Sequence, residues 1–264
     1  MSPSGQDDIG LRAEALVPIL RAAGCVYAED EAQLLLSAAA DASQLGSMVA
    51  LRLSGLPLEQ VVGWAAFCGQ RISVSPGVFV PRRRTEFLVR LAAARAFPGA
   101  VVVDMCCGSG AVGTALVNAC GPLELHAADV EPAAVSCARR NVEPLGGNVH
   151  QGDLFAALPP ELRGNVNLLV ANAPYVPTDS IGLMPPEARL YEPHVTLDGG
   201  ADGLDIQRRL ASEAPYWLMP GGSLLVETSE DQAEASAEIL ELCGFAASVE
   251  SSEDLDATVV IGTQ

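Results

Sequence analysis

The sequence predicts an α/β protein built on a doubly wound, largely parallel sheet, and three observations support this fold class. From residue 85 onward, apolar runs of strand length alternate with amphipathic segments of helical length. Hydrophobic residues make up 49% of the chain and aromatic residues only 5%, so Ala, Val and Leu must fill the core, as in helix-covered parallel sheets. Several apolar runs end on Asp or Asn, at the edge where such sheets bind ligands.

The N-terminal part of the chain has a different pattern, in which apolar residues recur at helical spacing. We expect a helix over 11–20 that ends near Gly24, a helix over 31–43 with Asp30 as its N-cap, and a short helix over 47–54. A unit of this size buries little surface by itself. We therefore expect it to pack on the rest of the chain. We assign a helical N-terminal domain to residues 1–62.

Two short β-rich segments follow this helical unit. They cover residues 64–68 and 71–74, with Gly69-Gln70 between them and Pro76-Gly77 after them. This spacing predicts a β-hairpin that serves as a linker over residues 63–80. The sheet domain then covers residues 81–264.

The alternation of helices and strands continues to the end of the chain. The expected elements are a helix over 85–96, a strand over 100–103 that ends at Asp104, a helix over 111–120, a strand over 123–128, a helix over 132–142, strands over 148–151 and 166–171, a Pro-rich loop, a helix over 203–218, a strand over 222–227, a helix over 230–242 and two closing strands. Right-handed crossovers should connect the parallel strands.

The formal net charge of the chain restricts its partners. At −18, with a pI near 4.4, most of the surface repels a polyphosphate, whereas nucleic-acid-binding proteins carry basic faces. Nucleic acid is therefore not an expected partner.

Cysteine usage and the N-terminal residues indicate the compartment. The 7 cysteines include no C-x-x-C pair and have no histidine cluster near them, so we expect free thiols and no metal site. The N-terminal MSPSGQDD is acidic, unlike a secretory signal, and no apolar run approaches the ~18 residues of a membrane span. We therefore expect a cytoplasmic protein without a membrane partner.

The first predicted strand of the sheet ends in a turn of small residues. Asp104 closes the strand, and the turn contains Cys106, Cys107, Gly108, Ser109 and Gly110. Glycines allow a ligand to approach the backbone, and the following helix offers free N–H groups to a carboxylate. An ordinary tight βα turn is the alternative.

Two further acids close the next strands and complete a candidate nucleotide site. Asp129 lies about 20 residues beyond the glycines, where an acid holds ribose hydroxyls. Asp153 can accept from an adenine amino group, with Leu154 and Phe155 covering the ring. Helix N-capping is the alternative role of each acid.

The fourth strand of the sheet runs into the segment Asn172, Ala173, Pro174 and Tyr175. A planar amide nitrogen is a poor nucleophile, so a catalyst must orient it toward an activated methyl group. The Asn172 side-chain oxygen and the Ala173 carbonyl can accept its two N–H groups, while the Tyr175 ring lies against the amide plane and Pro174 stiffens the loop. The alternative is a strand exit that merely contains proline.

These residues, in this order, resemble the HemK/PrmC family of protein-glutamine methyltransferases, and the resemblance is nearly end to end. Asn-Ala-Pro-Tyr is similar to the family's Asn-Pro-Pro-Tyr. Further segments similar to the family's are Gly55–Gly63, Pro81–Glu86, Glu192-Pro193, Gly199–Leu204, Pro220–Gly222 and Glu227.

The resemblance implies a seven-stranded, Rossmann-like class I methyltransferase sheet with a small helical N-terminal domain and a hairpin linker. It implies S-adenosylmethionine as the cofactor, bound by the residues of the small turn, Asp129, Asp153, Leu154 and Asn172. It also implies methylation of a glutamine side-chain amide in a class 1 peptide release factor, which the N-terminal helices help to hold.

The chain departs from the family pattern at a few positions. Ala173 replaces a proline, Cys106 replaces a glycine, and Arg82-Arg83-Arg84 replaces a more acidic stretch. In these features the chain resembles a divergent, actinobacterial-type subgroup. The three arginines form either a solvated or ion-paired face or a contact for an acidic substrate. Three functions stay as alternatives: N-methylation of a small molecule or peptide, adenine methylation, and a non-catalytic cofactor-binding module.

Overall fold

The computed structural model describes residues 5–264, and within them seven strands form one sheet in the order β5-β4-β3-β6-β7-β9-β8. The strands are β3 (Val101–Met105), β4 (Glu124–Asp129), β5 (Asn148–Gln151), β6 (Val166–Ala171), β7 (Leu218–Thr228), β8 (Ala246–Ser252) and β9 (Ala257–Thr263). The pairs among β3–β7 are parallel, and β9 is antiparallel to both β7 and β8. The strand order reverses between β3 and β6, which places a ligand crevice at their carboxyl ends.

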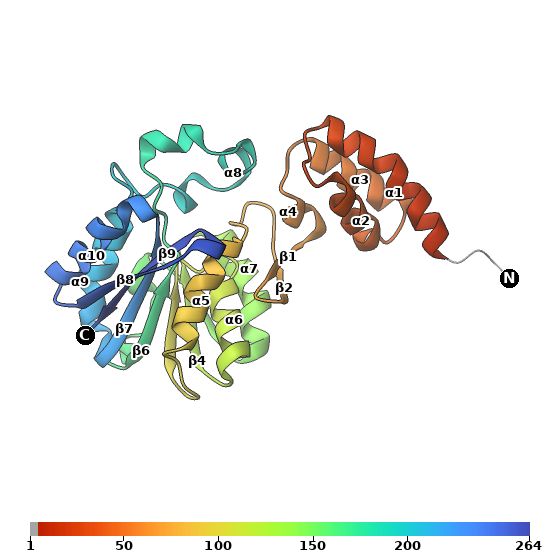
Figure 1. The fold of residues 1–264 in the computed structure, drawn as a ribbon. Coiled ribbons are helices and arrows are strands. Elements are labelled where there is room, and N and C mark those ends of the chain that lie inside the picture. Colours follow the sequence, from red (N-terminus) through yellow and green to blue (C-terminus); the bar gives the residue numbers. More distant parts are fainter. Residues whose placement is uncertain (1–4) are drawn as a thin grey trace.

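Helices cover both faces of this sheet (Figure 1). The helices are α1 (Gly5–Ala22), α2 (Ala28–Ala38), α3 (Ala42–Leu53), α4 (Leu58–Val62), α5 (Glu86–Ala93), α6 (Ala111–Cys120), α7 (Pro132–Val142), α8 (Pro186–Tyr191), α9 (Asp205–Glu213) and α10 (Ala233–Leu242). Residues of α5, α6 and α7 share one buried cluster with the sheet, and residues of α9 and α10 share the other. The expected doubly wound architecture is confirmed.

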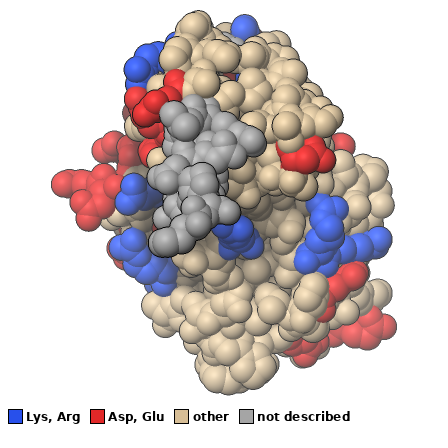
Figure 2. Space-filling view, turned by 90° about the vertical axis from the view of Figure 1, so that its right-hand side faces the viewer, with Lys and Arg blue, Asp and Glu red and all other residues tan. Residues whose placement is uncertain are grey.

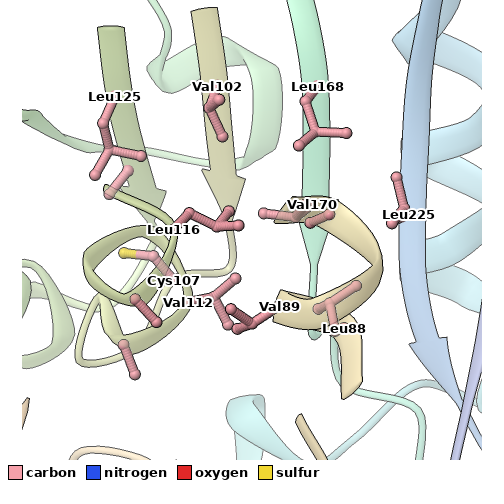
Figure 3. Packing of buried hydrophobic residues seen from close by; sticks show 14 of the residues in the cluster. Leu88, Val89, Val102, Cys107, Val112, Leu116, Leu125, Leu168, Val170 and Leu225 are labelled. Carbon is pink, nitrogen blue, oxygen red and sulfur yellow. The ribbon is translucent and has the colours of Figure 1, made fainter. Parts of the chain in front are cut away.

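Small aliphatic side chains fill the core between helices and sheet. On the face shown in Figure 3, Leu88 of α5 and Leu116 of α6 lie over Val102, Leu168 and Leu225 of three neighbouring strands. All five side chains are buried. This is the aliphatic core that the low aromatic content predicts.

The sheet elements agree with the sequence patterns except around β7. Strand β7 begins at Leu218 rather than at 222, and continues through Gly221-Gly222. At Gly222 a Cβ would lie 3.0 Å from the Val166 carbonyl oxygen, so glycine lets the two strands approach. The preceding helix ends early, at Glu213, because Pro215 cannot continue an α-helix.

The N-terminal helices differ from the expected pattern at several boundaries: α2 ends at Ala38 rather than at 43, α3 begins at Ala42 rather than at 47, and the short helix α4 was not predicted. The end of α1 is as predicted: Gly24 has φ +94°, and Cys25 N donates to Leu20 O at 3.0 Å. Asp30, however, is not an N-cap, because α2 already begins at Ala28. Asp41 caps α3 instead, accepting from Gln44 N at 2.8 Å.

The helical unit α1–α4 has its own small apolar cluster, which includes Leu20, Leu35 and Met48. Next to it, β1 (Trp64–Phe67) and β2 (Gln70–Ser73) form the expected antiparallel hairpin. The domain limits 1–62, 63–80 and 81–264 stay predictions, and residues 1–4 of the first lie outside the described part. Within the described residues, each helix is too short or too polar to cross a membrane.

Candidate active site

A cavity of about 410 Å³ opens at the carboxyl edge of the sheet. The turns after β3, β4, β5 and β6 line it, together with the end of β7 and segments near residues 79–85 and 195–197. This is the crevice that the reversal of strand order between β3 and β6 predicts.

The buried Asp104 carboxylate stabilises the turn after β3. The residue is 2% exposed, and Oδ2 accepts from Gly113 N in the first turn of α6 at 2.8 Å. Burial raises the pKa of Asp104 to about 7, although the bond from Gly113 acts in the opposite direction. The carboxylate thus joins the end of β3 to the start of α6.

The turn itself places Cys106, Cys107, Gly108 and Ser109 on the cavity wall. Gly110, predicted to join them, is not among the lining residues. It precedes α6 with φ +74° and packs against α7, where a Cβ would lie only 2.8 Å from Val142 Cγ2. The glycine therefore permits helix packing rather than close approach of a ligand.

Asp129 and Asp153 lie on the cavity wall as predicted, but in different surroundings. Asp129 accepts from Gly108 N at 2.8 Å and from Glu131 N at 2.9 Å, and burial raises its pKa. Asp153 is more exposed and forms an ion pair with Arg209 at 2.7 Å. Both carboxylates face a ligand-sized space.

The two residues after Asp153 point in different directions. Leu154 has φ +46° and lines the cavity. Phe155, expected beside it, instead stacks on Trp217 in the core with ring centroids 5.5 Å apart. Of these two residues, only Leu154 is placed to cover a ligand ring.

The segment from Asn172 to Tyr175, which follows β6, also lines the cavity. Asn172 Nδ2 donates to Thr85 Oγ1 at 3.2 Å, which leaves Asn172 Oδ1 as an acceptor. The Tyr175 hydroxyl donates to Glu227 Oε1 at 3.4 Å, and the Tyr175 carbonyl accepts from Gln232 Nε2 at 3.0 Å. Hydrogen bonds with Thr85, Glu227 and Gln232 thus fix the position of this segment.

Sequence reasoning did not assign Thr85, Arg209 or Glu227 to the site, although all three line the cavity together with Arg84. Glu227 is 1% exposed, and burial raises its pKa to about 7. A signal was available, because Glu227 follows an apolar strand just as Asp104 and Asp129 do. Thr85 and Arg84 come from before the sheet, and only tertiary structure brings them to its edge.

The three arginines at positions 82–84 differ in their contacts. Arg82 Nη2 forms an ion pair with the buried Glu192 at 2.6 Å. Arg82 and Arg84 both line the cavity, whereas Arg83 is not among the lining residues. Figure 2 shows basic side chains in separate groups, with acidic groups beside them, on the side of the N-terminal helices. An ion-paired role thus fits Arg82, and a position near the site fits both Arg82 and Arg84.

Within residues 5–264, no group of three or more His, Cys, Asp or Glu side chains is arranged to hold a metal ion. The seven cysteines are free thiols.

The sheet order and the cavity at its carboxyl edge are those of a class I methyltransferase. A solved methyltransferase from Pyrococcus furiosus has this fold, with a TM-score of 0.56 and 16% identity over 74% of this chain and 89% of that one. A T. thermophilus 16S rRNA methyltransferase, solved with AdoMet and guanosine, gives a TM-score of 0.54 at 17% identity, over 76% of this chain and 49% of that one.

Sequence comparisons identify the family. The family model "Methyltransferase small domain" matches residues 70–182. The release factor glutamine methyltransferase of Geobacter sulfurreducens is 38% identical over 200 residues, 75% of this chain and 69% of the relative. That of Streptomyces coelicolor is 39% identical over 189 residues, 70% of this chain and 67% of the relative. The chain belongs to the release factor glutamine methyltransferase (HemK/PrmC) family, whose methyl donor is S-adenosylmethionine. Its place in an actinobacterial-type subgroup stays a prediction.

Proposed function

We propose that this chain transfers a methyl group from S-adenosylmethionine to the side-chain amide nitrogen of a glutamine in a peptide release factor. The relatives that carry this name support the substrate. The observation that carries the proposal is the orientation of Asn172, whose amide nitrogen is held by Thr85 so that its oxygen is free to accept. A cytoplasmic location, where release factors act, belongs to the same proposal.

The residues of the cavity fit the cofactor. A volume of about 410 Å³ lies in the range of small-molecule sites. Asp129 offers a carboxylate at the carboxyl end of β4, where ribose hydroxyls are held in dinucleotide-binding folds. Asp153 and Leu154 offer an acceptor and an apolar contact for adenine, and the backbone near Gly108 and Ser109 borders the remaining space. When bound, the cofactor supplies an electrophilic methyl group.

We call Asn172–Tyr175 the acceptor segment, because it holds the substrate nitrogen in this proposal. Asn172 Oδ1 and the Ala173 carbonyl accept the two amide N–H groups, and the Tyr175 ring lies against the amide plane. Pro174 restricts the backbone between them. The chain's own contribution is to fix a weak nucleophile in one orientation, because positioning alone removes a large part of a bimolecular barrier.

The test is mass spectrometry of a release factor incubated with the enzyme and S-adenosylmethionine. We expect a gain of about 14 Da on a glutamine, since each transfer replaces one hydrogen by a methyl group. Asn172→Ala should lower the rate by roughly 10²-fold or more, as loss of a positioned polar contact does elsewhere. Asn165→Ala is the matched control, because Asn165 is exposed and outside the cavity.

Other results would favour other functions. An unmodified release factor, together with methyl transfer to a small molecule or peptide, would replace the proposed substrate. Tight cofactor binding without transfer to any glutamine would indicate a non-catalytic module.

A further inference from the structure

Glu227 stands apart from the other acids of the cavity. Asp104, Asp129, Glu131 and Asp153 lie at or just after the carboxyl ends of β3, β4 and β5, among the residues assigned to the cofactor. Glu227 lies near the end of β7 and is hydrogen-bonded to Tyr175 of the acceptor segment. Glu227 therefore lies beside the segment that is proposed to hold the substrate amide.

The two carboxylate oxygens of Glu227 differ in their partners. Oε1 accepts from the Tyr175 hydroxyl at 3.4 Å. Oε2 is buried and has no hydrogen-bond partner among the described residues. Leaving a buried carboxylate oxygen unpaired is costly, so such an atom requires an explanation in function.

The proposed reaction needs an acceptor for one proton. When the nitrogen–methyl bond forms and the sulfur–methyl bond breaks, the amide nitrogen still carries both hydrogens and gains a positive charge. One N–H bond must then break to give the neutral N-methyl amide. Asn172 Oδ1 and the Ala173 carbonyl can orient the N–H groups, but neutral amide oxygens do not retain a proton at neutral pH.

We propose that Glu227 takes up this proton on its free Oε2 atom, while Tyr175 holds Oε1. This inference rests on the proposed function and adds a proton acceptor to it. The N–H bond breaks, an O–H bond forms on Glu227, and the carboxyl group returns the proton to solvent before the next cycle. The methylated amide leaves uncharged.

The surroundings of Glu227 suit this role. Burial raises the pKa of Glu227 to about 7, and the hydroxyls of Thr85 and Tyr175 and the guanidinium of Arg84 act in the opposite direction. An acid–base group is most effective when its pKa lies near the working pH. Burial and the Glu227 carboxylate raise the pKa of Tyr175 to about 12, so the tyrosine remains a donor to Glu227.

The first test compares pH profiles of the methylation rate at saturating cofactor. We expect the wild-type rate to rise with pH and to level off above about 7, because only the charged carboxylate can accept a proton. Glu227→Gln should lose this rise and react roughly 10²–10⁴-fold more slowly. Tyr175→Phe keeps the carboxylate, so it should keep the rise and move its midpoint to higher pH.

The pH profiles distinguish a failure of the role proposed for Glu227 from a failure of the proposed function. A wild-type enzyme that leaves the release factor unmethylated would overturn the proposed function. A wild-type enzyme that methylates glutamine, with an equal pH profile in Glu227→Gln, would overturn the role of Glu227 alone.

A second test needs no substrate. Folded Glu227 binds its proton more tightly than the unfolded chain does, so the stability that it contributes is lost as pH rises through about 7. Thermal unfolding between pH 5 and 8 should therefore depend less on pH in Glu227→Gln than in the wild type. Glu230→Gln, at an exposed site nearby, is the control and should keep the wild-type dependence. Equal dependence in all three proteins would contradict the inference. Glu227→Ala, which also lacks a titratable group, replaces Glu227→Gln if the latter does not fold.

Discussion

Cys106 holds a backbone conformation that glycine adopts more easily. Its φ is +58°, in the left-handed region, where a residue with a side chain costs ~1–2 kcal/mol. The side chain lines the cavity beside the cofactor turn and also contacts the core cluster around Met105. The chain therefore holds a residue with a side chain in a backbone conformation that favours glycine.

Replacing Cys106 with glycine should stabilise the protein. We expect the free energy of unfolding to rise by about 0.5–1 kcal/mol, because relief of the left-handed strain exceeds the entropy that glycine adds to the unfolded chain. Denaturant unfolding measures the change. Cys107→Gly is the matched control: Cys107 is buried without a positive φ, so glycine there should destabilise. A loss of stability in both variants would show that Cys106 is not strained.

At the scale of elements, a turn of small residues supports the acceptor segment. Gly199 N donates to Val176 O at 2.9 Å, and Thr178 N donates to Gly200 O at 2.9 Å. A Cβ on Gly203 would collide with the carbonyl oxygen of Tyr175 and the side chain of Gln232. The turn before α9 must therefore be free of side chains where it meets the Asn172–Tyr175 segment.

The main effect of Gly203→Ala should be a lower methylation rate rather than a lower free energy of unfolding. The added methyl group displaces the Tyr175 carbonyl, and a shift of about 1 Å in a positioning segment can lower a rate roughly 10²-fold. Gly63→Ala is the matched control, since φ is +84° at Gly63 and +81° at Gly203, but only Gly63 has open space around its Cβ position. Rates at saturating cofactor, measured beside unfolding curves, test this. Equal loss of rate in both variants would contradict it.

At the scale of the whole molecule, Arg52 joins parts of the chain that are far apart in sequence. Its guanidinium is 9% exposed and pairs with Glu31 of α2 at 2.6 Å and with Glu187 of α8 at 2.6 Å. Nearby, the Tyr191 hydroxyl donates to the Ser54 carbonyl. The N-terminal helices are thus tied to the loop that follows the acceptor segment, and residues of that loop, such as Met184 and Leu197, line the cavity.

Arg52→Met should destabilise the N-terminal unit strongly. Loss of the arginine leaves the buried Glu31 without its partner, and such a loss costs ~3–5 kcal/mol. Arg21→Met removes the exposed Arg21–Glu29 pair and should cost ~1 kcal/mol or less. Urea unfolding followed by tryptophan fluorescence compares the two variants. Similar losses would show that the buried pair contributes no more than a surface pair.

The sequence by itself determined most of the sheet and much of the cavity. The bounds of α6, α7, β5 and β6 agree with the apolar periodicity, because in these elements the burial of one face follows directly from residue spacing. Asp104, Asp129 and Asn172 were found because the carboxyl ends of parallel strands meet at one edge. Each of these features depends on residues that are close together in sequence, so it can be predicted without the tertiary structure.

Only the tertiary structure decided which residues complete the acceptor site. Thr85 lies 87 positions before Asn172 and Glu227 lies 52 positions after Tyr175, yet hydrogen bonds join each of these pairs. Phe155 and Gly110 pack away from the cavity for a related reason, since Trp217 and α7 occupy space that spacing along the chain does not reveal. Periodicity identifies the buried face of an element, whereas the partner it meets depends on how distant elements pack.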